Sequence, residues 1–153
     1  MNRTAIQIFF AFMLSIFATT AVFAKTPIPS LNLSSSGLAL RGYDPVAYFK
    51  SNKPIKGKSS ISTKNAGATY YFSSAANKEL FLQNPTKYLP AYGGYCAYGT
   101  AVGAKVDGDP NIWHIVNGKL YLNITRPIDR TWNRDRAGYI KDANRQWPKL
   151  RNK

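Results

Sequence analysis

Cysteine and histidine are nearly absent from this chain of 153 residues. It contains one cysteine, Cys96, and one histidine, His114, so an intramolecular disulfide is excluded. Four sulfur or nitrogen ligands for a structural zinc ion cannot be assembled from these two residues, and structural zinc is not expected. Copper(I) bound by the Cys96 thiolate stays open, and the cofactor is otherwise unknown.

Negative charge is also scarce. The chain has 7 acidic residues against 21 lysines and arginines, which gives a formal net charge of +14. Asp44 suits a helix cap, and Asp107 and Asp109 suit turn positions. Paired acid–base catalysis is therefore thinly supported, and nothing resembles a serine triad or a phosphate-binding loop. These absences favour a non-catalytic protein, while enzymatic activity stays an open question.

Residues 1–24 predict a cleavable signal peptide. Arg3 supplies a short positive region, an uncharged stretch follows it, and small residues precede a cleavage point after Ala24. A membrane anchor is the alternative, but the apolar stretch is shorter than the roughly 20 residues that span a bilayer. We therefore expect a periplasmic protein, with secretion beyond the periplasm left open.

The excess of positive charge indicates the kind of partner that an exported protein would meet. Outside the cytoplasm the available anions are membrane headgroups, cell-wall polymers and acidic proteins, so nucleic acid is not the expected partner. The stretch 119–153 holds ten basic and three acidic residues, which would suit an anionic surface. An ordinary solvated basic surface without a dedicated partner explains the same composition.

The mature chain has the length of one domain. We expect an extended lead-in over 25–41, one domain over 42–150 and a basic tail over 151–153. No internal repeat is evident. The predicted class is α+β: a small single domain with two β-hairpins, short helices and a long C-terminal helix.

Two hairpins and two helices are predicted from local patterns. Strands 61–64 and 68–72 flank a three-residue turn, and a helix over 75–83 follows Ser74. This helix is expected to bury Ala76, Leu80 and Phe81. The second hairpin joins 112–116 to 119–124 through Asn117-Gly118, a pair typical of a type I′ turn.

The remaining helical signals are prolines and an apolar stripe. Asp44 and Pro45 predict the start of a short helix that contains residues 46–49. A long helix is expected from Pro127 to Pro148, with a kink allowed at Gly138. Its apolar face is formed by Ile128, Trp132, Tyr139, Ala143 and Trp147.

Several separated motifs resemble the exported bacterial YHS-domain proteins. They are Gly42-Tyr43-Asp44-Pro45-Val46-Ala47-Tyr48-Phe49, Tyr70-Tyr71-Phe72-Ser73-Ser74, Asn84-Pro85, Tyr92-Gly93-Gly94-Tyr95-Cys96-Ala97-Tyr98-Gly99, Gly118-Lys119-Leu120-Tyr121-Leu122-Asn123 and Trp147-Pro148-Lys149-Leu150. The resemblance spans 42–150 and implies this family's fold and an exported location.

Function follows less directly from the resemblance. Shorter YHS-type domains, some attached to metal transporters, look like cysteine-bearing metal-binding modules. This chain has Ser73 and Ser74 where a thiolate ligand would be wanted, so it resembles the cysteine-poor members. For these members the resemblance implies no agreed activity.

The glycine- and tyrosine-rich segment 92–99 is the candidate site. Its ligand-binding candidates are Tyr92, Gly93, Gly94, Tyr95, Cys96 and Tyr98. The glycines would let the backbone approach a ligand, and the tyrosines would line a pocket. The alternative is that these tyrosines form the domain core and that Cys96 is a buried, inert thiol.

Three functions remain in view. The first is a non-catalytic module that binds a small ligand, a metal or a protein at residues 92–99. The second is a thiol-dependent enzyme or copper-handling protein that uses Cys96, with His114 as a second metal ligand if the fold brings the two together. The third is adhesion to anionic membrane or cell-wall surfaces.

Overall fold

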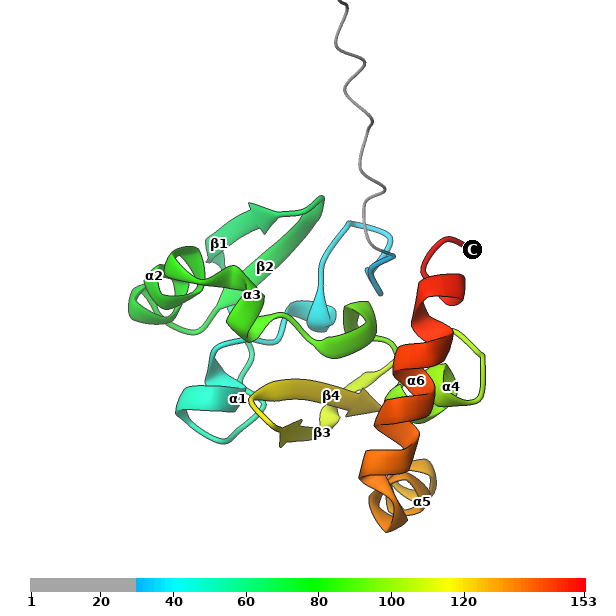
Figure 1. Cartoon of the computed structure of the whole chain (residues 1–153). Coiled ribbons are helices and arrows are strands. Elements are labelled where there is room, and N and C mark those ends of the chain that lie inside the picture. The colour runs from blue at the N-terminus through cyan, green and yellow to red at the C-terminus, as the bar shows by residue number, and fades with distance from the viewer. Residues whose placement is uncertain (1–29) are drawn as a thin grey trace, which may run out of the picture.

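The computed structural model describes residues 30–153, and the predicted signal peptide lies outside this range. As predicted, the described chain is a small α+β domain with two antiparallel hairpins, short helices and a C-terminal helix (Figure 1). The elements, with two short 3-10 turns labelled η, are η1 (Leu40–Gly42), α1 (Ala47–Lys50), β1 (Lys58–Asn65), β2 (Ala68–Phe72), α2 (Ala75–Gln83), α3 (Pro85–Tyr88), η2 (Ala91–Gly94), α4 (Ala97–Ala101), β3 (Asp109–Val116), β4 (Lys119–Asn123), α5 (Arg126–Arg134) and α6 (Arg136–Leu150). Within residues 30–153 no helix has the length and apolar character needed to cross a membrane.

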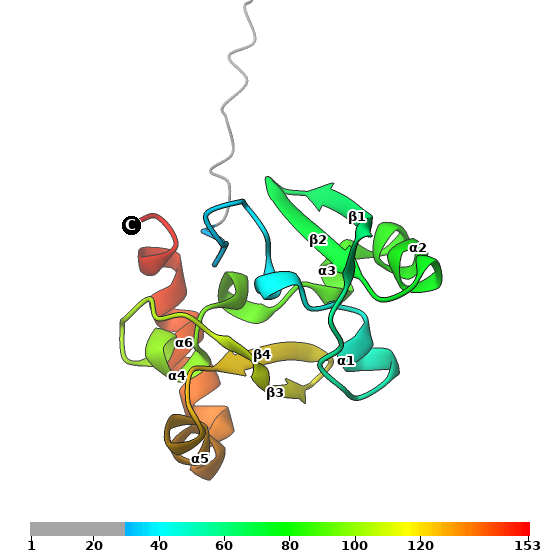
Figure 2. The same cartoon turned by 180° about the vertical axis from the view of Figure 1, so that it is seen from behind.

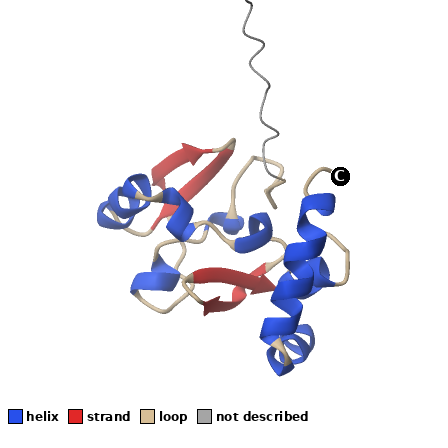
Figure 3. Ribbon diagram, in the orientation of Figure 1, coloured by secondary structure: helices blue, strands red, loops and turns tan. Residues whose placement is uncertain are grey.

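The hairpins turn where the sequence predicts, but the first turn is tighter. Asn65 pairs with Ala68, so the turn consists of Ala66 and Gly67 and the predicted three-residue turn is wrong. In the second hairpin Asn117 and Gly118 have φ values of 50° and 72°, as a type I′ turn requires. Figure 3 shows the two hairpins as separate strand pairs among the helices.

Helix α2 has the predicted bounds. The Ser74 hydroxyl accepts a hydrogen bond from Asn77 N at 3.1 Å, which caps the helix. Phe81 is fully buried and Leu80 half-buried, but Ala76 is exposed, against the prediction. Helix α2 packs against the core through Phe81. A small residue such as Ala76 is tolerated on the solvent-exposed face, because alanine favours the helix and does not need to be buried.

The predicted long helix is two helices. Asp135 has φ −149° and ψ 67°, which ends α5, and its carboxylate accepts a hydrogen bond from Gly138 N at 2.9 Å to begin α6. A Cβ at residue 138 would lie 2.1 Å from Asp135 Oδ2, so glycine leaves room for this cap. Pro148 lies inside the last turn of α6, which ends at Leu150 rather than at the proline.

Asp44 caps α1 as predicted, although the helix itself begins only at Ala47. Its Oδ1 accepts hydrogen bonds from Val46 N at 2.8 Å and Ala47 N at 3.3 Å. Its Oδ2 accepts from Ser73 N at 2.8 Å, Ser73 Oγ at 2.6 Å and Asn77 Nδ2 at 2.7 Å. This fully buried carboxylate therefore ties α1 to the end of β2 and the start of α2.

The chain builds one unit twice, so the absence of an internal repeat in the sequence does not extend to the structure. Each unit is a hairpin followed by a capped helix, and the boundaries of the second lie 51 residues after those of the first (58 and 109, 72 and 123, 83 and 134). We call them unit 1 (58–83) and unit 2 (109–134). The repeat escapes sequence inspection because few aligned positions match, Gly67 with Gly118 and Tyr70 with Tyr121 among them.

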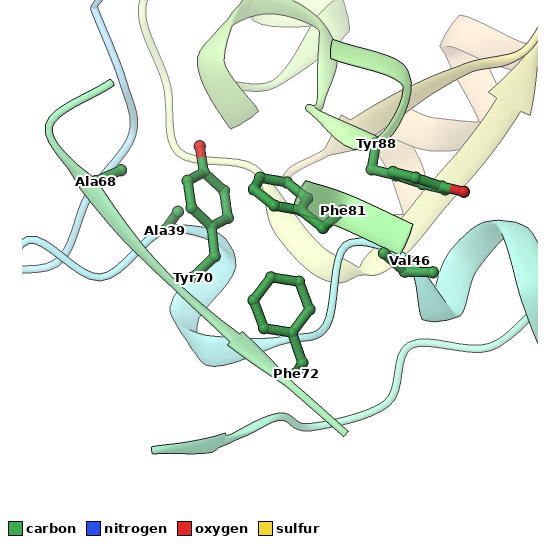
Figure 4. Close-up of a cluster of buried hydrophobic side chains, with 7 residues drawn as sticks. All are labelled: Ala39, Val46, Ala68, Tyr70, Phe72, Phe81 and Tyr88. Carbon is green, nitrogen blue, oxygen red and sulfur yellow. The ribbon is translucent and has the colours of Figure 1, made fainter. Parts of the chain in front are cut away.

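Each unit has an aromatic core at matching positions. In unit 1 the Phe81 ring lies 5.0 Å from Tyr70 and 5.2 Å from Phe72 between ring centroids (Figure 4). In unit 2 the Trp132 ring lies 5.8 Å from Tyr121. Helix α6 runs beside α4 on the side of unit 2, as Figures 1 and 2 both show.

The predicted lead-in is part of the domain where the structure describes it. Ala39 and Leu40 are buried, and Leu31 and Leu33 pack against the core. Asn32 N donates a hydrogen bond to the Gly93 carbonyl at 2.9 Å. Figures 1 and 2 place this segment between hairpin β1–β2 and the end of α6. It thereby closes one side of the space between the two units.

Candidate functional site

A cavity of about 280 Å³ lies where the two units, the N-terminal segment and α6 meet. We call it the central pocket. Its walls come from Leu31, the β1–β2 turn at Ala66, strands β2 and β4, and η2. Asn144 and Trp147 of α6 complete it. Five separate segments of the chain therefore converge on one hollow.

Aromatic rings form much of the pocket wall. The Tyr92 ring lies 5.9 Å from Tyr121 and 5.8 Å from Trp147 between centroids. Tyr92 has φ 52°, an uncommon conformation for a residue with a Cβ. Its hydroxyl donates a hydrogen bond to Asn144 Oδ1 at 3.0 Å, which ties η2 to α6.

Two buried tyrosines line the pocket without using their hydroxyls. Tyr70 of β2 is 2% exposed and Tyr121 of β4 is 7% exposed. Among residues 30–153 neither hydroxyl has a hydrogen-bond partner, and neither oxygen is a fully buried unpaired atom, so both reach accessible space. In Figure 4 the Tyr70 hydroxyl points away from Phe72. These two phenols line the central pocket with hydroxyls that no described residue pairs with.

Both phenols are protonated at neutral pH, and burial moves their pKa further above it. Loss of solvent raises the pKa of Tyr70 to about 12 and also raises the pKa of Tyr121. The pKa of Tyr92 is raised as well, by burial and then by the nearby Tyr121. The pocket therefore presents neutral hydroxyls that can donate hydrogen bonds.

The structure divides the six predicted ligand-binding residues between different places. Tyr92 and Gly93 line the central pocket, and Tyr95 lies beside it with its ring 6.2 Å from Trp147. Gly94 is buried and does not line the pocket. Cys96 and Tyr98 line a separate hollow.

Gly93 is required by the fold. A Cβ at this position would lie 2.2 Å from the Ser30 carbonyl oxygen, and the residue has φ 63°. The glycine therefore allows the N-terminal segment to cross η2 closely. This contact helps to position Leu31 at the central pocket.

The Cys96 side chain is buried in an apolar environment. The residue is 1% exposed, its Sγ donates to Asn123 Oδ1 at 3.5 Å, and Gly99 N donates to Sγ at 3.4 Å. Burial raises the pKa of the thiol, although neighbouring backbone N–H groups oppose the shift. The hollow of about 260 Å³ beside it is walled by apolar residues such as Val102 and Ile128. A raised thiol pKa lowers the thiolate fraction that nucleophilic attack or metal binding needs.

A chain of hydrogen bonds connects Cys96 to His114 without direct contact. Asn123 accepts from the thiol and donates through Nδ2 to Asp129 Oδ1 at 2.9 Å. Asp129 Oδ1 also lies 2.9 Å from His114 Nε2, and Asn133 donates to Asp129 Oδ2 at 3.1 Å. The predicted Cys96–His114 pair therefore belongs to one network but does not face a common ligand position.

His114 has no nitrogen free for a metal. Arg136 Nη2 lies 3.2 Å from Nδ1, and Nε2 lies 2.9 Å from Asp129 Oδ1 and 3.4 Å from Asn133 Nδ2. A guanidinium can only donate, and the shorter contact of Nε2 is to a carboxylate, which together favour the tautomer in which Nδ1 accepts and Nε2 donates to Asp129. The imidazole also stacks on Trp132 at 5.4 Å between centroids. Over residues 30–153 no group of three or more His, Cys, Asp or Glu side chains is placed to hold a metal ion.

Sequence reasoning did not select most of the central pocket. The sequence places Tyr70, Lys119 and Tyr121 in predicted strands and Trp147 on the apolar face of a predicted helix, none of which signals a site. Tyr70 and Tyr121 are related only by their spacing of 51 residues, which places them at matching positions of β2 and β4. No local sequence pattern marks Asn123 or Asp129 as a site residue either, because their hydrogen-bond network depends on the packing of β4 against α5.

A YHS domain is found at residues 46–92, where the profile of that family matches the chain. The match is less than half of the chain. It contains all of unit 1 and ends within η2, before unit 2 begins. No curated protein and no solved structure matches the chain.

Proposed function

We propose that this protein is a non-catalytic binding module that takes a small ligand into the central pocket, and that it acts in the periplasm after removal of residues 1–24. One observation carries the proposal: the buried side chains of Tyr70 and Tyr121 line a cavity, and their hydroxyls have no partner among residues 30–153. A YHS domain at 46–92 fits a binding module.

The hydroxyls of Tyr70 and Tyr121 can contribute to the free energy of binding a ligand. A net hydrogen bond contributes about 1 kcal/mol, so a ligand that accepts hydrogen bonds from both phenols would gain from each of them. The volume of about 280 Å³ lies at the lower end of the range for small-molecule pockets. The aromatic walls and this size suit a ligand with a single ring.

The thiol-based alternative has less support. Cys96 is buried, its pKa is raised, and both nitrogens of His114 are engaged in hydrogen bonds. These features suit a packed thiol better than a nucleophile or a copper ligand. Adhesion to an anionic surface is supported by net charge alone.

The proposal is tested by ligand-observed NMR with single-ring probes (phenol, benzyl alcohol, phenylacetamide and phenylacetate). The double variant Tyr70→Phe/Tyr121→Phe is expected to weaken binding about thirtyfold, because each of the two lost hydrogen bonds contributes about 1 kcal/mol. Tyr98→Phe removes a hydroxyl at the other hollow and serves as the control. Absence of binding by every probe, or equal loss in the Tyr98 variant, would contradict the proposal.

The compartment has its own test. Intact-mass measurement of the protein recovered from the periplasm should show a chain that begins at Lys25. A full-length mass in the membrane fraction would contradict export by a cleaved signal peptide.

A further inference from the structure

The polar groups that face the central pocket are all able to donate hydrogen bonds. The Tyr70 and Tyr121 hydroxyls have no partner among residues 30–153, and Lys119 brings an ammonium group. The Asn144 Oδ1 is occupied by the Tyr92 hydroxyl, which leaves the amide N–H₂ of Asn144 as its free end. No acidic residue lines the pocket. Such a set favours a ligand that brings acceptors.

Lys119 stands at the mouth of the pocket. It is the first residue of β4, is exposed, and lines both the central pocket and an adjoining hollow of about 380 Å³. Within the described chain it takes part in no ion pair. At the matching position of unit 1 the residue is Ala68, which is buried. The positive charge is therefore a feature of unit 2 alone.

Further cations line hollows that share residues with the central pocket. The adjoining hollow is also lined by Lys87, and another hollow of about 460 Å³, which shares Asn144 with the central pocket, is lined by Arg136 and Lys141. No acidic side chain lines either of these hollows. Like charges gathered around an opening raise the local concentration of anions and speed their association.

The interior of the pocket has the opposite character. Leu89, Pro90 and Trp147 add apolar surface to the tyrosine rings. Aromatic faces favour contact with the edge or the offset face of another ring. A ligand that satisfies both regions has an uncharged ring at one end and a negative charge at the other.

We infer that the ligand of the central pocket is a small aromatic carboxylate, whose ring lies among Tyr92, Tyr121 and Trp147 and whose carboxylate meets Lys119 at the mouth. This inference rests on the proposed function, because it names the chemical class of the ligand for the same pocket. The two carboxylate oxygens accept hydrogen bonds from Lys119 and from the pocket hydroxyls of Tyr70 and Tyr121, and the charge-assisted bond to lysine is the stronger kind.

The test compares ligands of one shape and different charge by isothermal titration calorimetry at low salt. Phenylacetate is expected to bind at least tenfold more tightly than the neutral phenylacetamide, and the cationic benzylamine more weakly than both. Lys119→Gln should remove the preference for phenylacetate by lowering its affinity to about that of phenylacetamide. Lys149→Gln makes the same change in net charge on an exposed position of α6 outside the pocket lining and should keep the preference.

The possible results distinguish failure of the carboxylate inference from failure of the proposed binding function. Equal binding of phenylacetate and phenylacetamide, with both dependent on Tyr70 and Tyr121, would overturn the carboxylate inference and leave a neutral-ligand pocket. Equal loss of preference in Lys119→Gln and Lys149→Gln would overturn it too, because the effect would then be one of net charge. If neither compound binds, both the inference and the proposed function fail.

Discussion

The two hairpin–helix units place different side chains at the same point of the fold. Asp44 N donates to the Ile55 carbonyl just before unit 1, and Cys96 N donates to the Val106 carbonyl just before unit 2, both at 2.8 Å. Each side chain then receives backbone N–H groups from the short helix that follows it. Ile55 and Val106 are 51 residues apart, like the units themselves (55 and 106). The two junctions are therefore equivalent in structure.

The difference between the junctions lies in what holds them. In unit 1 the carboxylate of Asp44 collects five hydrogen bonds from neutral donors. In unit 2 the Cys96 thiol makes two long contacts, with Asn123 Oδ1 and Gly99 N. The buried carboxylate of unit 2 is instead that of Asp129, which contacts Asn123 and His114. The same backbone arrangement therefore accepts a carboxylate or a thiol at this junction, provided that its N–H groups find an acceptor nearby.

The largest effect is expected at Asp44. Asp44→Ala leaves buried donors of Val46, Ser73 and Asn77 without an acceptor, and should lower the free energy of unfolding by roughly 3–5 kcal/mol. Urea unfolding followed by circular dichroism measures the loss. Asp44→Asn, which keeps one acceptor oxygen, should lose less. A loss below about 1 kcal/mol for the alanine variant would show that the carboxylate does not hold unit 1 together.

A smaller effect distinguishes the matching tyrosines. The pKa of Tyr70 is about 12 in the folded protein against about 10 in the unfolded chain, so the folded state holds this proton more tightly. Its contribution is complete below pH 10 and is lost as the pH rises from 10 to 12, by up to roughly 2 kcal/mol.

This pH dependence is measured as the difference between the wild-type protein and Tyr70→Phe in urea unfolding at pH 9 and pH 11. The variant should lose less stability over this interval. Identical losses would contradict the buried, protonated state of Tyr70. The same comparison for Tyr121→Phe shows whether the tyrosine of unit 2 is held as strongly.

At Cys96 the expected change is about 1 kcal/mol, because its sulfur makes only long contacts at 3.4 and 3.5 Å. Cys96→Ala should therefore destabilise the protein much less than Asp44→Ala in the same urea experiment. Iodoacetamide should modify the wild-type thiol slowly until the protein is unfolded, since its pKa is raised by burial. Fast modification of the folded protein would revive the thiol-based function.

The smallest effect concerns Trp132, which matches Phe81 of unit 1. Its Nε1 is buried and has no hydrogen-bond partner among residues 30–153. Trp132→Phe removes this unpaired donor, which offsets the packing lost with the larger ring, and stability should change by less than about 1 kcal/mol. A thermal-shift loss several times larger than that of Cys96→Ala would show that the indole of Trp132 is needed.

The sequence predicted the parts of the fold that depend on neighbouring residues. Asn117-Gly118 indicated its turn because both residues tolerate positive φ, and Ser74 indicated the start of α2 because a hydroxyl can cap a helix. The break at Asp135 was missed, although an aspartate three residues before Gly138 is a capping signal. The apolar stripe through Trp132 and Tyr139 concealed this signal.

Long-range features could not be predicted in the same way. The repeat rests on backbone geometry that different side chains support, such as Phe81 and Trp132. The central pocket joins residues from opposite ends of the chain, Leu31 and Trp147 among them, and no local pattern relates these positions. Tyr92 was selected as a candidate because it lies in a glycine-rich segment, and the structure places it at the pocket.

The most direct test of the account is a chemical-shift map of the protein titrated with phenylacetate. The account predicts that the largest changes fall on Tyr70, Lys119, Tyr121 and Trp147, with little change at Cys96. Changes centred on Cys96 and its apolar hollow, or no saturable change at any residue, would contradict the central pocket as the binding site.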